Sequence, residues 1–274
     1  MKPPKVQIVQ RLVLVTAVVI AVVFAWRAPL DAAAAQQVDA GLKRALLSFA
    51  SARALNAIIS VVQGTEVAVE PAGVGVVFTP GQVLDPVNDL VEQFSDLMLL
   101  ASVSFGVQSV LINIGAYWPV SLLLSLAALG WAFGYLRMRP VPGWLARGLA
   151  VLLMVRFAVP VVAIGSETLF QKFMAADYSA SQQAIDTTSE RLVRLNPPAA
   201  AASEQGVLER LQGWWSRNGD VKLRFEQLKQ AAEHATENVI RLIVIFLLQT
   251  LVIPLLLLWL LYGVTRRAFQ AEPG

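Results

Sequence analysis

One charged side chain interrupts an otherwise apolar stretch of this chain. Residues 148–165 read GLAVLLMVRFAVPVVAIG, and Arg156 lies near their middle. A guanidinium is always charged and carries five N–H donors, so it needs acceptors wherever water is absent. Charges inside membrane-spanning helices are costly and mark pathways or structural contacts. Arg156 is therefore the first candidate for a functional residue.

The predicted partner of Arg156 is Gln249, in the apolar stretch 242–264. Heptad steps back from Phe170 lead to Arg156, and steps of four and three from Leu242 lead to Gln249. At about 1.5 Å per residue the two depths differ by roughly 3 Å. An amide oxygen accepts from a guanidinium without neutralising it, so we expect water, a carbonyl freed by a proline, or another chain to contribute. The alternative is that Arg156 snorkels from a short, tilted helix.

A second set of ionisable residues recurs along one predicted helix face at intervals of four, three and four. The set is Asp85, Asp89, Glu92 and Asp96. Such a face could bind a cation or a basic partner, but carboxylates near a helix N-terminus also keep one face solvated. Calcium takes about six to eight oxygens, which one helix face cannot supply. We expect a solvated acidic face and no metal site.

The residue inventory leaves little for catalysis. The chain has no cysteine and one histidine, His234, which we expect on a solvated helix surface. Ser102 and Ser104 lie in an apolar run without a visible base. Nucleophilic catalysis needs a nucleophile beside a base, so the sequence predicts no enzyme and no cofactor.

The composition is that of a polytopic membrane protein. Of 274 residues, 56% are hydrophobic and 15% are charged, whereas soluble domains have about 25% charged residues. A net charge of +3 is mild and gives no reason to expect nucleic-acid binding. Five runs approach the roughly 20 residues that cross a bilayer. They are Leu12–Leu30, Leu97–Tyr117, Trp118–Tyr135, Leu145–Gly165 and Leu242–Val264.

Basic residues predict the orientation in an inner (plasma) membrane. Arg137, Arg139 and Arg147 share one short loop, and Arg266 and Arg267 follow the last run. Cytoplasmic loops are rich in Lys and Arg, and two crossings separate these clusters. Both clusters, and the C-terminus, are therefore expected in the cytoplasm.

The N-terminus is harder to place. Lys2, Lys5 and Arg11 precede the first run, as in a retained signal anchor, although cleavage near "DAAAA" is an alternative. An inside N-terminus and five full crossings would put the Arg137 loop outside. Either residues 97–117 re-enter or lie on the outer interface, or the N-terminus is outside. We favour the first.

A small outer module is predicted between the first two runs. Leu42, Leu46, Phe49, Arg53, Ile58 and Val62 have near-helical spacing, which predicts an amphipathic helix. "TEVAVEPAGVGVVF" alternates around a Pro-Gly turn, which predicts a β-hairpin of residues 67–69 and 74–76. Asp85 and Pro86 then suit the cap and first position of another helix.

A helical stalk is predicted from the spacing after the fourth run. One stripe comprises Phe170, Met174, Tyr178, Ser181, Ile185, Thr188, Leu192 and Leu195. A second comprises Val221, Phe225, Leu228, Ala232, Ala235, Val239 and Leu242. Alternating steps of three and four indicate a coiled-coil seam, so we expect an antiparallel stalk continuous with the fourth and fifth spans.

The fold is therefore predicted as all-α and polytopic, with four to five membrane helices, an antiparallel outer stalk and a small β-hairpin module. The expected divisions are an anchor at 1–30, an outer module at 31–93, membrane helices at 94–165, a stalk at 166–241 and a last span with a cytoplasmic tail at 242–274.

Two further features suggest contacts with other helices or proteins. Gly130 and Gly134 form a GxxxG pair that lets a helix approach closely. Trp214 and Trp215 lie near the predicted stalk tip, where they pack internally, touch the membrane surface or bind a partner. The predicted function is a non-enzymatic membrane protein that organises envelope partners or its own copies through the stalk. The alternative is a transporter or channel subunit that uses Arg156.

Overall fold

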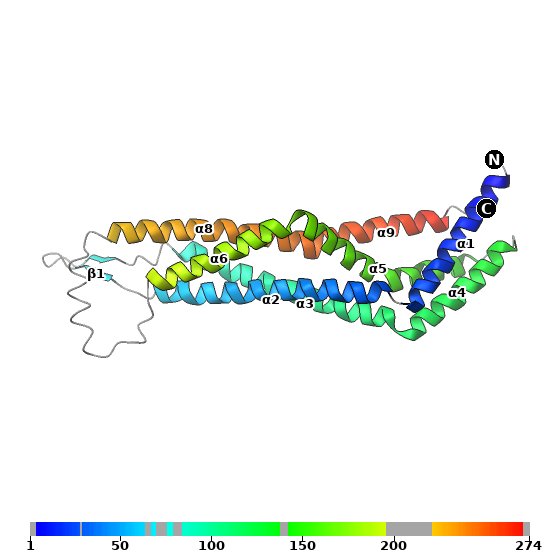
Figure 1. Cartoon of the computed structure of the whole chain (residues 1–274), viewed down its shortest axis with the longest axis horizontal. Coiled ribbons are helices and arrows are strands. Elements are labelled where there is room, and N and C mark those ends of the chain that lie inside the picture. Colours follow the sequence, from blue (N-terminus) through cyan, green and yellow to red (C-terminus); the bar gives the residue numbers. More distant parts are fainter. Residues whose placement is uncertain are drawn as a thin grey trace. The chain divides into compact units, whose positions relative to one another are not determined.

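The computed structural model describes residues 4–27, 29–63, 67–69, 76–78, 84–137, 142–195 and 221–270. These residues are almost entirely helical, which confirms the all-α class. The helices are α1 (Pro4–Arg27), α2 (Pro29–Gln63), α3 (Asp85–Ala116), α4 (Trp118–Leu136), α5 (Gly143–Phe173), α6 (Ala175–Leu195), α8 (Val221–Leu247), the π-helix η3 (Leu248–Val252) and α9 (Ile253–Gln270) (Figure 1).

The predicted number of membrane helices is confirmed. Four helical segments among the described residues are long and apolar enough to cross a membrane, and the bent pair Leu12–Arg27 and Pro29–Val61 raises the number to five. The four are α3, α4, α5 and the segment Lys229–Arg267. The chain is therefore described as a multi-pass membrane protein.

The chain divides into two compact units. The first unit comprises Met1–Lys43, Ser102–Lys172 and Leu248–Gly274. The second comprises Arg44–Ala101 and Phe173–Leu247. Residues from the expected outer module and from the expected stalk thus contribute helices to the same unit.

The core of the first unit joins α1, α4 and α5. Its buried residues are Val18, Ala25, Leu124, Ala128, Trp131, Ala146 and Leu149. The Trp131 ring stacks on Tyr135 with 4.6 Å between ring centroids. A Cβ added at Gly130 would lie 3.6 Å from Leu145, so α4 and α5 pack closely here. Gly134 is half-buried.

In the second unit, α6 and α8 pack side by side along the predicted seams (Figure 1). Eight buried positions belong to the stripes read from the sequence: Ser181, Ile185, Thr188 and Leu192 on α6, and Ala232, Ala235, Val239 and Leu242 on α8. Helix α8 also buries Ile245 and Phe246 beyond the end of its stripe. The side chains of Phe225 and Leu228 lie outside the described residues. The packing of α6 against α8 is therefore observed, and an outer stalk stays a prediction.

The buried face of α2 differs from the predicted one. Within the second unit α2 buries Ala45, Ser48, Ala52, Leu55 and Ile59. Leu46, a predicted core residue, is 47% exposed. Small residues let helices approach closely, and Ser48 donates to Gln182 on α6 at 2.8 Å. Close approach and hydrogen bonding thus outweigh side-chain size in selecting the face.

The predicted β-hairpin module is not supported as a separate folded part. The structure gives only the antiparallel pairing of β1 (Val67–Val69) with β2 (Val76–Phe78), with Val67 opposite Phe78. Val74, expected in the second strand, lies outside the described residues. After this pair, α3 begins at Asp85 as predicted, and Gln63 donates to the Asp85 carboxylate at 2.6 Å.

A charge in the α6–α8 seam should unfold the second unit. We expect Val239→Asp to cost about 2–5 kcal/mol, because the fully buried Val239 offers a carboxylate no water. The adjacent Ile240→Asp is the control, since Ile240 is 48% exposed. Limited proteolysis in detergent measures the effect. Equal protection of the two variants would contradict the seam.

Tyr178 should make stability depend on pH. Burial raises the pKa of Tyr178 above its ordinary value of 10.0. The neutral phenol is therefore favoured in the fold, so its contribution is present below about pH 10 and is lost as the pH rises through the raised pKa. Between pH 9 and 11 we expect the thermal midpoint of the wild type to fall more steeply than that of Tyr178→Phe. Parallel curves would refute this, and Tyr262→Phe at an exposed tyrosine is the control.

Candidate functional site

Arg156 is the most deeply buried charge of the first unit. It lies within α5, and its side chain is 1% exposed. Helix α5 continues through Pro160. The side chain of Arg156 is directed from this helix into the interior of the first unit. The burial of this side chain agrees with the prediction of a buried residue and disagrees with the alternative in which Arg156 snorkels.

The partner of Arg156 is Asp31, in the first turn of α2. Nη1 donates to Oδ1 of Asp31 at 2.7 Å, and Nη2 donates to Oδ2 at 2.5 Å. This two-pronged arrangement matches the planar guanidinium to the carboxylate. The predicted pairing with Gln249 is wrong, because an acid with full opposite charge occupies the guanidinium instead.

Arg156 also binds the C-terminal turn of α1. Its Nη2 donates to the carbonyl oxygen of Ala25 at 3.0 Å. Ser121 on α4 donates to the same carbonyl at 3.2 Å. Carbonyls at a helix C-terminus lack helical partners, so these donors replace the missing bonds. Nearby, the Trp26 indole donates to Ser125 at 2.9 Å. Helices α4 and α5 thus hold the break between α1 and α2.

The backbone at Arg156 is also closely packed, against the end of α3. A Cβ added at Gly115 would lie 3.3 Å from the carbonyl oxygen of Val155 and 3.7 Å from that of Arg156. Pro160 has no N–H and cannot donate to the carbonyl four residues earlier, which is that of Arg156. The end of α3 therefore approaches α5 where the helical ladder is interrupted.

A second polar cluster surrounds Glu167, farther along α5. Gln249 donates to Oε2 of Glu167 at 3.2 Å, and Gln171 donates to Oε1 at 2.7 Å. Glu167 is 4% exposed and Gln249 is 2% exposed. Gln249 lies in η3, the π-helical turn just before Pro254. Since a proline cannot complete a regular α-turn, the π-helical widening is its local accommodation.

The predicted acidic face stays open. Asp85, Asp89, Glu92 and Asp96 are all exposed on α3. Asp96 lies 4.0 Å from Arg53, which is a loose surface pair. Among the described residues no group of three or more potential ligands could hold a metal ion. His234 is exposed on α8.

Some predicted contact and topology residues cannot be placed. Arg139, Trp214 and Trp215 lie outside the described residues. The proposed tip and part of the basic loop therefore stay predictions.

Sequence reasoning missed Asp31 and Glu167 as site residues. Each lies within two residues of the predicted end of an apolar run, at Leu30 and Gly165, and was assigned to the polar region that follows. Spacing was the usable signal. Glu167 lies four residues beyond Ala163 on the Arg156 face, and Asp31 begins the three-four stripe that α2 buries.

Arg156 and Asp31 bind each other through both terminal nitrogens and both carboxylate oxygens, whereas the buried Nε of Arg156 has no hydrogen-bond partner among the described residues. Neither a family model nor a curated protein nor a solved structure matches the chain. The geometry alone therefore carries the functional inference.

The ion pair should be strongly coupled. Asp31→Ala or Arg156→Ala alone should each cost about 3–5 kcal/mol, because each leaves a buried charge uncompensated. The double variant should cost clearly less than the sum of the two single losses. Unfolding in detergent measures the cycle, with Arg147→Ala on exposed α5 surface as control. Strictly additive losses would show that the pair is not coupled.

Proposed function

We propose that this chain is a non-enzymatic, multi-pass protein of the inner (plasma) membrane that contacts a protein partner through its outer helical part. The buried charges of the first unit hold the membrane helices together. The helices of the second unit present the contact surface.

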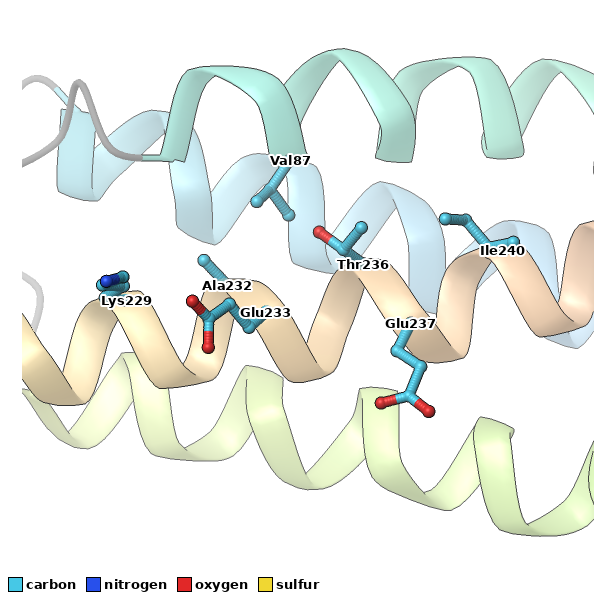
Figure 2. Close-up of a pocket in the computed structure, with 7 residues that line it drawn as sticks. All are labelled: Val87, Lys229, Ala232, Glu233, Thr236, Glu237 and Ile240. Carbon is cyan, nitrogen blue, oxygen red and sulfur yellow. The ribbon is translucent and has the colours of Figure 1, made fainter.

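The observation that carries this proposal is an open groove in the second unit, between α3 and α8 (Figure 2). Its volume is about 540 Å³. Val87 on α3 faces Thr236 and Ile240 on α8 in Figure 2. Ala232 extends the apolar lining, and Lys229, Glu233 and Glu237 contribute charged groups.

The groove fits an amphipathic helix as its occupant. Apolar anchors at helical spacing dock into such grooves, and polar rims fix their register. Glu237 pairs with Arg241 at 3.5 Å, so Glu233 and Lys229 remain as the charged lining groups and favour a partner helix that carries both signs. The packed pair of α6 and α8 adjoins the groove, which is open rather than enclosed and therefore suits an interaction surface.

Basic residues support an outer location for the groove. Arg137, Arg147, Arg266 and Arg267 belong to loops or ends that the distribution of positive charge assigns to the cytoplasm. Helices α6 and α8 lie between the two crossings that separate these arginines. The proposed orientation therefore puts α6 and α8 on the outer side of the membrane and the C-terminus on the cytoplasmic side.

A transporter or channel subunit is the second candidate, because Glu167 is a buried carboxylate within an apolar helix. Ionisable residues at membrane depth often line pathways. This candidate would be favoured if proteoliposomes that contain the wild-type protein show solute flux and those that contain Glu167→Gln do not. Arg156 supports it less, since Asp31 already occupies the guanidinium.

Site-specific photo-crosslinking in native membranes tests the groove. A photo-reactive residue at Thr236 should give one discrete adduct with another protein. The same residue at exposed Gln183 on α6 should give none. Thr236→Arg variants should lose partner binding at least tenfold while the thermal midpoint stays unchanged, since a long cation blocks the groove without entering the core. The absence of a discrete adduct at position 236 would refute the proposal.

A further inference from the structure

Contacts within the first unit fix the level at which the first part of α2 lies. Asp31 is bonded to Arg156 on α5. Ten residues along α2, a Cβ added at Gly41 would strike the ring of Phe105 on α3. Gly115, ten residues after Phe105, approaches the backbone at Arg156. The α2 segment 31–41 therefore runs beside α3 residues 105–115.

The neighbours of this α2 segment are candidate membrane helices whose outer surfaces are mainly apolar, with Asn113 of α3 as an exposed polar residue. Helices α3 and α5 are both candidate spans. At this level α3 exposes Val107 and Val110, and α5 exposes Val161. Helix α9 joins them, because Leu257 contacts Gly165 of α5. These apolar surfaces are suited to contact with the acyl chains of lipids.

The outer surface of α2 does not match acyl chains. Its exposed stripe comprises Ala32, Gln36, Asp39 and Lys43, spaced four, three and four. The stripe lies opposite the buried residues Ala34 and Val38. In hydrocarbon the Gln36 amide would find no partner, and the Asp39 carboxylate and the Lys43 ammonium would have only each other, one turn apart. This polar stripe therefore needs a cover other than lipid.

We propose that the cover is a second copy of this chain, with α2 packed parallel against its counterpart. Two copies inserted in the same direction are related by an axis along the membrane normal, so each residue of the stripe meets its own copy. The inference rests on the proposed membrane location of the first unit. It does not depend on the partner of the α3–α8 groove.

The chemistry of the stripe suits this pairing. Ala32 lets the two backbones approach closely. Gln36 has both donors and an acceptor, so it pairs with its own copy across the axis. Asp39 and Lys43 lie one turn apart, so at the axis the two carboxylates and the two ammonium groups form a neutral cluster, in which each carboxylate has an ammonium one turn away on its own helix and another on the second copy. Pores whose filters are charged carry rings of one sign. Opposite charges in adjacent turns instead favour a closed contact.

Cysteine crosslinking tests the contact directly, because the chain has no native cysteine. Single variants Ala32→Cys and Gln36→Cys should form disulfide-linked dimers in native membranes under mild oxidation. Gln37→Cys, about 100° around the helix and half-buried, should not. Labelling with a membrane-impermeant maleimide should stay low at position 36.

Charge exchange provides the second arm. In the Ala32→Cys background, Asp39→Lys or Lys43→Asp alone should lose most of the dimer yield, and the double exchange should restore it. Strong maleimide labelling of Gln36→Cys without dimers would identify a water-filled pathway and overturn the proposal. Labelling only by a lipid-soluble reagent would identify a lipid-facing helix and overturn it equally. Neither result would bear on Thr236 crosslinking, so the two proposals fail separately.

Discussion

The ion pair between Arg156 and Asp31 is the constraint on which the first unit depends. Within apolar helices no water is present to solvate a charge, so each charged group must find its partners in the protein. Asp31 supplies the opposite charge, and Ala25 supplies a carbonyl at the end of α1. One side chain on α5 therefore binds both the last turn of α1 and the first turn of α2.

The proline positions show the same constraint acting on the backbone. Pro160 removes one hydrogen bond from α5, and Gly115 lets α3 approach at that point. Pro254 follows the π-helical turn that contains Gln249. Gln249 is then used by Glu167 rather than by Arg156. The two proline interruptions described here thus lie close in sequence to buried polar side chains, Arg156 and Gln249.

Hydrophobic runs and their spacing were sufficient to predict the number of membrane helices, the start of α3 and the seam between α6 and α8. They were insufficient for the buried face of α2 and for the partner of Arg156. A stripe of Ala45, Ser48 and Ala52 carries little hydrophobic signal, because its packing depends on close approach and on hydrogen bonds to Gln182. Asp31 was missed for a related reason. A charge beside an apolar run resembles a boundary until its opposite charge, 125 residues away in sequence, is placed next to it.

The closed state of the ion pair also bears on function. A transport site has to exchange partners during its cycle, and Arg156 would have to release both Asp31 and the α1 carbonyl to do so. The cost of exposing two unpaired charges to hydrocarbon opposes that release. Among the described residues, exposed charges lie on α2 in the first unit, and on the acidic face of α3 and around the α3–α8 groove in the second. The proposed contact between proteins rests on these charges at helix faces rather than on groups in an enclosed cavity.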